Sequence, residues 1–128
     1  MLYLVQWMRS LIFAVQMYIA MTVIAFFGAP ISLLRTDYAC VVVRLFCNYV
    51  TWSASWIIGL QTEIRGEPPS GEILIAAKHQ SFLDVIMIVS KTPKPKFIMK
   101  SSLNYVPIIG FYARRIGCIS VKLSLIHI

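Results

Sequence analysis

Residues 10–34 contain no charged side chain, and Arg9 and Arg35 stand at the two ends of this run. A helix over residues 10–29 would be about 30 Å long, which matches the thickness of the hydrocarbon layer of a membrane. The sequence therefore predicts a spanning or deeply embedded helix, and the Gly-Ala-Pro sequence at residues 28–30 predicts its end. Two alternatives are a cleaved signal peptide, although the run is long and has no clear cleavage site, and a buried helix of a soluble protein.

A second apolar stretch, residues 37–60, carries a narrow polar stripe. Its four polar residues follow at steps of four, three and four, which places them on one helical face: Arg44, Asn48, Thr51 and Ser55. Trp52 and Trp56 stand one turn apart, and tryptophan favours the headgroup level of a membrane. We expect an amphipathic helix that lies in, or returns through, one leaflet and pairs with the first helix as a membrane hairpin. The alternative is a helix packed on a soluble body with its stripe facing water.

The composition supports this division of the chain. Hydrophobic residues make up 59% of the sequence and charged residues 13%, which lies outside the range of ordinary soluble domains. Residues 1–60 have three arginines and one aspartate, a net charge of +2, whereas residues 61–128 have nine basic and four acidic residues, a net charge of +5. A membrane-attached hairpin followed by a basic body explains both biases. A nucleic-acid partner is not expected, because the apolar first half does not suit one.

The three cysteines give no sign of a metal site. Cys40, Cys47 and Cys118 form no CxxC pair and no ligand cluster, so we expect them to be packing residues.

After residue 60 the pattern changes to short alternating elements. Four strands are expected, at residues 62–66, 72–78, 96–100 and 117–121. Three helices are expected, at residues 82–90, 101–104 and 108–115, with Pro107 between the last two. The nearly apolar run 72–78 is typical of a strand covered on both faces. The alternation predicts an α/β fold with a mainly parallel sheet and flanking helices, and such a sheet needs further strands.

A histidine and an aspartate stand where the strand 72–78 meets the helix 82–90. Five helical positions separate His79 from Asp84 and turn about 140°, so the two cannot share a helical face if both are helical. With His79 in the loop and Asp84 in the first turn, the carboxylate could accept a hydrogen bond from one ring nitrogen and leave the other as a base. The alternative is a turn histidine and a first-turn carboxylate favoured by the helix dipole.

Three blocks of the sequence resemble one enzyme family. Residues 79–84, His-Gln-Ser-Phe-Leu-Asp, resemble the H-x4-D motif of the glycerolipid acyltransferases, specifically the 1-acyl-sn-glycerol-3-phosphate (lysophosphatidic acid) acyltransferases. Residues 100–110 resemble the second motif of that family, a lysine followed by a leucine and a Pro-x-x-Gly turn. Residues 117–121 resemble its glycine-led strand, and the expected hairpin resembles that of the bacterial members.

The resemblance implies a reaction and a set of residues. A fatty acyl group would pass from acyl-CoA or acyl-carrier protein to the sn-2 hydroxyl of lysophosphatidic acid and give phosphatidic acid, with no metal and no bound cofactor. His79 would be the general base and Asp84 its partner. Four residues would bind substrate: Ser81, Lys100, Gly110 and Arg114. The partners would be membrane lipid and the two substrates, with the catalytic domain on the cytoplasmic side of the inner or plasma membrane.

The sequence also departs from that family. Its third motif, a Glu-Gly-Thr-Arg stretch, and the arginine past the glycine-led strand are both missing. We therefore expect an N-terminal fragment, a truncation that can remove activity, with the hairpin at residues 1–60 and part of the acyltransferase domain at residues 61–122. Residues 123–128 resemble a translated sequencing adapter, so we expect a non-native tail and exclude His127 from the site. Alternatives are an acyltransferase for glycerol-3-phosphate, another lysophospholipid or a lipid A precursor, and a non-catalytic basic membrane protein.

Overall fold

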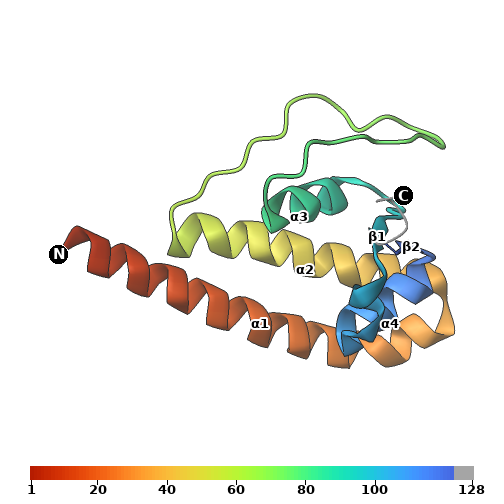
Figure 1. The fold of residues 1–128 in the computed structure, drawn as a ribbon, viewed down its shortest axis with the longest axis horizontal. Coiled ribbons are helices and arrows are strands. Elements are labelled where there is room, and N and C mark those ends of the chain that lie inside the picture. The colour runs from red at the N-terminus through yellow and green to blue at the C-terminus, as the bar shows by residue number, and fades with distance from the viewer. Residues whose placement is uncertain (123–128) are drawn as a thin grey trace.

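The computed structural model describes residues 1–122, so the expected non-native tail lies outside the described residues. Two long helices run side by side: α1, Leu2–Leu34, and α2, Thr36–Ile57 (Figure 1). The extended backbone of Arg35 separates them, with φ −148° and ψ 141°. Near the open end of the pair, Arg9 Nε of α1 donates a hydrogen bond to the Ile57 carbonyl of α2. The expected helical hairpin is confirmed.

Hydrogen bonds and a close approach of the two helix backbones hold α1 against α2. The Gln16 amide donates to Ser53 Oγ at 3.1 Å, and the Tyr49 hydroxyl donates to Gln16 Oε1 at 2.6 Å. Nearer the turn, Gly28 is buried, and a Cβ at this position would lie 2.6 Å from the Val42 side chain. Glycine is therefore needed there for the two helices to approach each other.

The expected helix end at residues 28–30 is wrong, because α1 continues through Pro30 to Leu34. A proline inside a helix removes one backbone hydrogen bond and crowds the preceding turn. Packing offsets this cost here, since Ala25, Gly28 and Ser32 are buried on one face of α1 around the proline. Ser32 Oγ also donates to the Gly28 carbonyl at 2.8 Å.

The remaining elements follow a long connecting segment. They are α3, Phe82–Lys91; β1, Ile98–Lys100; the 3₁₀ helix η1, Ser101–Tyr105; α4, Pro107–Ile116; and β2, Ile119–Val121. The helices expected at residues 82–90 and 108–115 are confirmed to within one residue at each end. Pro107 opens α4, where its missing N–H costs nothing, and Gly117, with φ 87°, ends it in the left-handed region.

The two strands form a small parallel sheet. β1 pairs with β2 in the register Ile98 opposite Ile119 and Lys100 opposite Val121. The parallel pairing and the order of these elements agree with the expected α/β fold. The described residues are mostly helical, however, and the sheet has two strands where four were expected.

The strands expected at residues 62–66 and 72–78 are wrong. Residues 61–81 contain no strand and are exposed throughout; they run out from α2 and return to α3 (Figure 1). Within this segment Gly66 and Gly71 both have a positive φ, a backbone conformation that favours glycine. A strand requires a hydrogen-bonding neighbour as well as apolar side chains, and β1 and β2 pair with each other rather than with this segment.

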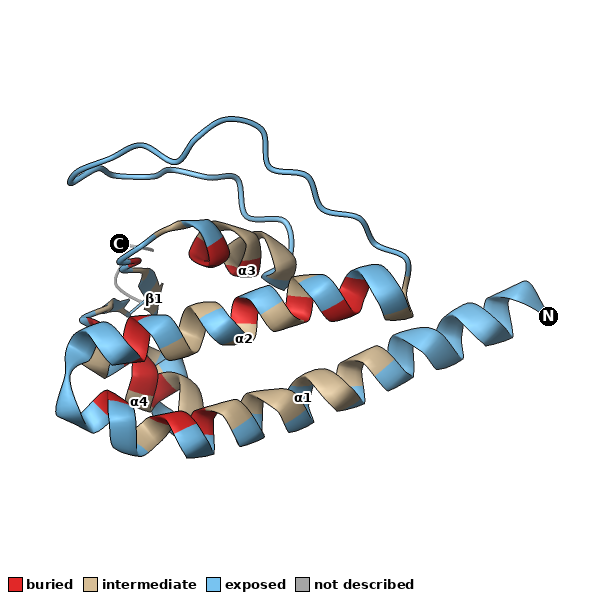
Figure 2. Cartoon of the chain, turned by 180° about the vertical axis from the view of Figure 1, so that it is seen from behind, coloured by how far each residue is buried: buried red, intermediate tan, exposed pale blue. Residues whose placement is uncertain are grey.

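Two hydrophobic clusters join the hairpin to the elements that follow it. In the first, Ala39 and Cys40 of α2 pack with Tyr112 and Ile116 of α4. In the second, four buried residues pack between α2 and α3: Cys47, Val50, Ile86 and Val89. Buried residues accordingly lie where α3 and α4 meet the hairpin, whereas the outer side of α1 is exposed (Figure 2). The hairpin thus supplies part of the hydrophobic core against which α3 and α4 pack.

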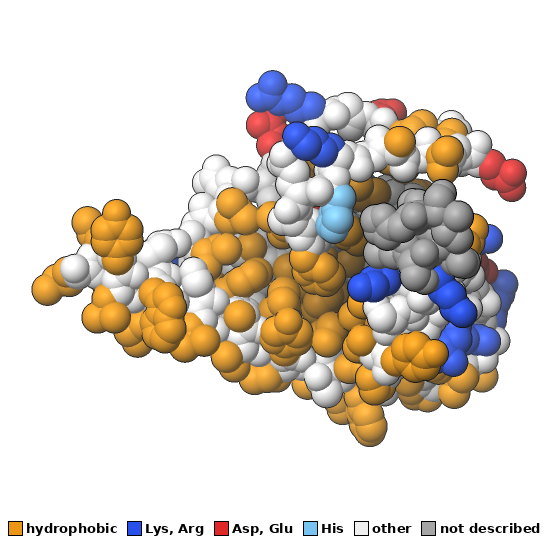
Figure 3. Space-filling view, in the orientation of Figure 1, with side chains coloured by type: hydrophobic (Ala, Val, Ile, Leu, Met, Phe, Trp, Pro, Cys, Tyr) orange, Lys and Arg blue, Asp and Glu red, His pale blue; other side chains and the backbone are white. Residues whose placement is uncertain are grey.

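The exposed side of the hairpin is apolar. Most of the large apolar side chains of α1 are exposed, among them Ile19 at 59% and Phe26 at 74%, and hydrophobic side chains cover the hairpin in Figure 3. Within the described residues, α1 is the one helix that is long and apolar enough to cross a membrane. A buried helix of a soluble protein would not expose so many large apolar side chains. The exposed apolar surface of α1 therefore favours association with a membrane.

Candidate active site

The first turn of α3 is built around one carboxylate. Asp84 Oδ2 accepts hydrogen bonds from the backbone N–H groups of Gln80 and Ser81, both at 2.8 Å. Ser81 is the N-cap, and with Asp84 three residues on it forms a capping box, which satisfies N–H groups that the helix cannot pair itself. The helix thus begins at Phe82, three residues after His79.

His79 lies on the extended chain that leads into this cap, and it is exposed to solvent. Among the hydrogen bonds of residues 1–122, none joins the imidazole ring to Asp84. The expected bond from ring to carboxylate is thus not formed, and the carboxylate is engaged by the cap. The two groups still lie close enough to interact through their charges, and Oδ1 of Asp84 has no hydrogen bond within the described chain.

The surroundings of Asp84 favour its ionised form. The N–H groups of Gln80 and Ser81 lower the pKa of Asp84 below its ordinary value of 3.8, and the charge of His79 lowers it further. A carboxylate that is ionised at neutral pH can stabilise a positive charge on the ring beside it. This pair can therefore accept a proton at His79 and compensate the charge that results.

Lys100 lies away from this pair. It is exposed at the end of β1, and β1 lies beyond the C-terminal end of α3 in both ribbon views (Figure 1 and Figure 2). His79 precedes the opposite end of α3, a helix of ten residues and about 15 Å. The structure brings Ser81 and Asp84 together with His79, but it places Lys100 toward the far end of this helix.

Gly110 and Arg114 join η1 to α4. A Cβ at Gly110 would lie 2.3 Å from the Asn104 carbonyl oxygen, so this approach needs glycine. Arg114 Nη2 donates to that same carbonyl at 3.1 Å, and its Nε donates to the Gly110 carbonyl, also at 3.1 Å. These contacts join the backbone at Asn104 to that at Gly110, and the Arg114 side chain remains exposed.

Two contacts of α4 with α1 are not evident from the motifs. The buried Tyr112 hydroxyl donates to the Ala25 carbonyl at 2.8 Å. Arg115 donates through Nη2 to the Ser32 carbonyl at 2.7 Å and to the Leu33 carbonyl at 3.1 Å, at the C-terminal turn of α1. A cation at that end of a helix pairs with carbonyls that lack an intrahelical partner. Tyr112 and Arg115 are three residues apart and therefore lie on one face of α4. This spacing is the feature of the sequence from which the face of α4 that packs on α1 could have been recognised.

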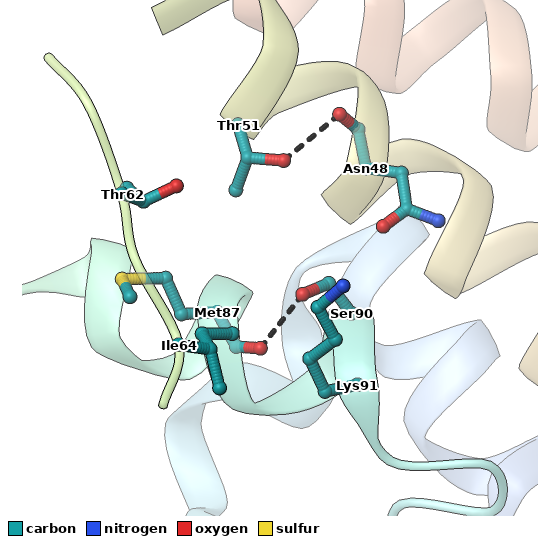
Figure 4. Close-up of a pocket in the computed structure, with 7 residues that line it drawn as sticks. All are labelled: Asn48, Thr51, Thr62, Ile64, Met87, Ser90 and Lys91. Carbon is teal, nitrogen blue, oxygen red and sulfur yellow. Dashed lines mark hydrogen bonds between the residues drawn. The ribbon is translucent and has the colours of Figure 1, made fainter. Parts of the chain in front are cut away.

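A pocket of about 190 Å³ lies between α2, α3 and the segment that follows α2 (Figure 4). Asn48 and Thr51 line it from α2, and Ser90 and Lys91 line it from α3. Neither His79 nor Asp84 is among its lining residues. The polar stripe read from the sequence therefore faces α3 and this pocket over part of its length.

Residues 1–122 contain no group of three or more His, Cys, Asp or Glu side chains placed to hold a metal ion. The three cysteines are free, and Cys40 and Cys47 are buried in the two hydrophobic clusters.

Comparison with known proteins adds one match. The family model described as Acyltransferase matches residues 61–124, which is half of the chain. No curated protein and no solved structure matches it. The match covers His79 and Asp84, the block from Lys100 to Gly110, and β2.

Proposed function

Since the chain belongs to the acyltransferase family, we propose that it makes phosphatidic acid by transferring a fatty acyl group to the sn-2 hydroxyl of 1-acyl-glycerol-3-phosphate. The donor is a thioester, either acyl-CoA or acyl-carrier protein. The observation that supports this proposal most is the exposed imidazole of His79 beside the capped carboxylate of Asp84, within the matched region.

His79 is the proposed proton acceptor. Its neutral ring takes the proton of the sn-2 hydroxyl as the hydroxyl oxygen attacks the thioester carbonyl carbon. The tetrahedral intermediate then collapses, the carbon–sulfur bond breaks, and the imidazolium returns its proton to the departing thiolate. The acceptor hydroxyl takes the place of a nucleophilic serine, so no acyl-enzyme intermediate is formed. Imidazole suits this exchange because it can both accept and return a proton under neutral conditions.

Asp84 is proposed to act on the ring through its negative charge. One oxygen, Oδ2, stays with the backbone of Gln80 and Ser81, while Oδ1 is left to accept a hydrogen bond from the ring once substrate orders it. The cap holds the carboxylate in position before the reaction begins. This arrangement resembles the division of labour in a hydrolase triad, where the acid orients the base.

Basic residues are proposed to hold the anionic parts of both substrates. Lys and Arg side chains gather over the side of the molecule formed by β1, β2 and α4 (Figure 3). Lys100 and Arg114 belong to the matched region, and both are exposed. Clustered positive charge raises the local concentration of anionic lipids and thioesters. Ser81 and Gly110 are proposed to contribute through the backbone: Ser81 caps α3 beside His79, and Gly110 allows η1 to approach α4 closely.

We also propose that the hairpin lies in one leaflet. α1 has 33 residues and is about 50 Å long, which exceeds the hydrocarbon thickness of about 30 Å. α3 packs along the side of α2, so a hairpin that crossed the bilayer would carry α3 and its polar cap into the hydrocarbon. With its apolar face in the lipid, the hairpin instead holds His79 at the membrane surface, which we propose is the cytoplasmic side.

The test is a comparison of acceptors. Protein reconstituted in phosphatidylcholine vesicles is supplied with labelled oleoyl-CoA or oleoyl-carrier protein and, in separate reactions, with lysophosphatidic acid, glycerol-3-phosphate or lysophosphatidylcholine. Products are identified by mass spectrometry. Phosphatidic acid as the main product, with the new chain at sn-2, supports the proposal. Faster acylation of glycerol-3-phosphate or lysophosphatidylcholine would assign a different acyltransferase, and acylation of none would contradict catalysis.

A further inference from the structure

Two of the three cysteines belong to one hydrophobic cluster. Cys40 of α2 is a buried member of the first cluster, and Cys118, which lies between α4 and β2, packs against that cluster. Both are free thiols. Cys47, the third cysteine, is buried in the second cluster, between α2 and α3, so it is separate from this pair. The proposed acyl transfer uses neither thiol of the first cluster.

Two polar contacts connect the surroundings of Cys40 with those of Cys118. Asp37, one turn before Cys40 on α2, forms an ion pair with Lys94 at 3.1 Å. Three residues after Lys94, the backbone N–H of Phe97 donates a hydrogen bond to Cys118 Sγ at 3.4 Å. The charge of Cys118 also acts on the Cys40 thiol, so the two sulfurs lie within electrostatic reach of each other. The fold thus makes neighbours of two thiols that are 78 positions apart in the sequence.

The two thiols differ in their exposure to solvent. Cys40 is 6% exposed; burial raises the pKa of its thiol, and the charge of Asp37 raises that pKa further. Cys40 is therefore held in the protonated form and shielded from oxidants in the solvent. Cys118 is partly exposed, so a dissolved oxidant reaches its sulfur first. An accessible thiol beside a second, shielded thiol is the usual arrangement of a redox-sensitive pair.

We propose that Cys40 and Cys118 are a redox-sensitive pair that hydrogen peroxide converts into a disulfide. The Cys118 thiolate attacks one peroxide oxygen, the O–O bond breaks, and the departing hydroxide takes up a proton to become water. The Cys40 sulfur then attacks the sulfur of the resulting sulfenic acid. The S–O bond breaks, and the hydroxide leaves with the Cys40 proton as a second water. The two sulfurs lose two electrons in total, which the peroxide gains, and a dithiol reverses the change by exchange.

The disulfide would fasten α4 and β2 to the hairpin. Cys118 follows Gly117 directly after α4, and Tyr112 and Ile116 of α4 pack in the same cluster as Cys40. A covalent bond at Cys118 would thus reinforce a junction that packing and hydrogen bonds hold in the reduced protein. Because it closes a long loop of the chain, it would also restrict the unfolded state. We therefore expect the oxidised protein to be more stable to heat than the reduced protein.

Peptide mapping tests the pair, because trypsin separates the three cysteines. Cleavage after lysine and arginine places Cys40 in residues 36–44, Cys47 in residues 45–65 and Cys118 in residues 116–122. The full chain in detergent micelles is treated with a small excess of hydrogen peroxide, the remaining thiols are alkylated, and the unreduced peptides are identified by mass spectrometry. We expect Cys40 and Cys118 to be linked by a bond that dithiothreitol removes. Oxidation of either thiol without this link, or a link to Cys47 instead, would overturn the proposal.

An equal mixture of isotopically labelled and unlabelled chains distinguishes a bond within one chain from a bond between two chains. After oxidation, each linked pair of peptides is expected to be wholly labelled or wholly unlabelled. Linked pairs that combine a labelled with an unlabelled peptide in the random proportion would show a bond between chains and would contradict the pairing within the fold.

Serine variants assign the role of each thiol. Cys40→Ser and Cys118→Ser should each abolish the link, whereas Cys47→Ser, the matched control, should keep it. In Cys40→Ser, sulfenic acid should persist at Cys118 and be trapped by dimedone, because the second thiol is missing. Equal trapping at Cys40 in Cys118→Ser would overturn the assigned order of attack.

Thermal unfolding measures the effect of the bond on the fold. In Cys47→Ser, oxidation should raise the midpoint of thermal unfolding by at least about 5 °C, and dithiothreitol should reverse the shift. Cys118→Ser should show no such shift. Equal midpoints for oxidised and reduced Cys47→Ser would overturn the fastening of α4 and β2 to the hairpin.

Discussion

Asp84 combines a structural contact with a proposed chemical one. Its Oδ2 caps α3 through two backbone N–H groups, and its charge reaches His79 on the chain just before the cap. The spacing in the sequence allowed a loop histidine and a first-turn aspartate to meet; in the structure they lie close enough for their charges to interact, but the expected hydrogen bond between them is not formed. The capping bonds were less evident, because the Ser-x-x-Asp pattern is a variant of the capping box that usually ends in Glu or Gln.

The cap makes stability depend on pH. The pKa of Asp84 is lower in the folded protein than its ordinary value of 3.8, so its ionised form stabilises the fold. That contribution is fully present above the ordinary value and is lost as the pH falls through the lower, folded value. Thermal unfolding of the protein and of Asp84→Asn is compared from pH 3 to 7; the difference between them should be largest above about pH 5 and should shrink as the pH falls below the ordinary value of 3.8. A difference that stays constant down to pH 3 would contradict this account of the cap.

Substitution by glutamate separates the two tasks of Asp84. Glu is the usual partner in a capping box, so Asp84→Glu should preserve the cap while it moves the charge relative to His79. We expect kcat to fall at least about tenfold in Asp84→Glu and in Asp84→Asn, because general-base catalysis contributes about 10²- to 10⁴-fold and depends on the orientation of the base. Circular dichroism checks that α3 remains intact. Full turnover in Asp84→Glu would contradict a role of Asp84 in catalysis and leave it only the role of capping α3.

At the scale of elements, the junction of η1 and α4 depends on glycine. The sequence predicted a helix at residues 108–115 after Pro107, and α4 agrees with it to within one residue at each end; Gly117, expected as the first residue of a strand, instead ends the helix. The reason for Gly110 was not visible in the sequence, since it depends on how closely the Asn104 carbonyl approaches. Arg114 then bonds to both carbonyls of this contact.

Gly110→Ala should destabilise the protein. Alanine gains about 1 kcal/mol in helix propensity, but its Cβ would meet a backbone oxygen at 2.3 Å, and overpacking of this kind costs about 1–3 kcal/mol or more. We therefore expect a net loss in the free energy of unfolding, measured by chemical denaturation. Ser102→Ala, at an exposed position of η1, serves as the control and should change stability little. Equal or greater stability in Gly110→Ala would show that η1 moves away from α4 at little cost.

The strands show where prediction from the sequence stops. Residues 96–100 and 117–121 contain β1 and β2, which satisfy each other's backbone groups. The more apolar run, residues 72–78, is exposed and unpaired in the described structure. Apolar composition indicates that a segment can be buried in a sheet, but pairing depends on a neighbour that local sequence does not specify.

At the scale of the whole molecule, the hairpin belongs to the fold as well as to the membrane. α2 contributes to both hydrophobic clusters, so its inner face is the surface on which α3 and α4 pack. The long charge-free run predicted α1, and the polar stripe predicted that α2 has two different faces. The sequence alone could not show that α4 docks on α1 through Tyr112 and Arg115, because these contacts join residues more than 80 positions apart.

Charges placed on the outer face of α1 should weaken membrane binding without unfolding the protein. Ile19 and Phe26 are both more than half exposed and lie outside the two hydrophobic clusters, so Ile19→Glu and Phe26→Glu should lose little packing. Each loses about 2 kcal/mol of apolar burial in lipid, and we expect vesicle partitioning to fall at least about tenfold in a flotation assay. Ser102→Glu adds the same charge on η1 and should float normally. Normal flotation of the two α1 variants would place lipid on another surface.

The central claim, that the imidazole of His79 takes the proton from the acceptor hydroxyl, is tested most directly by one rate. Initial formation of phosphatidic acid from oleoyl-CoA and lysophosphatidic acid is measured for the protein and for His79→Ala, both bound to the same vesicles. We expect a loss of at least about 10²-fold in kcat with vesicle binding unchanged, because His79 is exposed and contributes no packing. Turnover by His79→Ala at the rate of the unaltered protein would contradict the account.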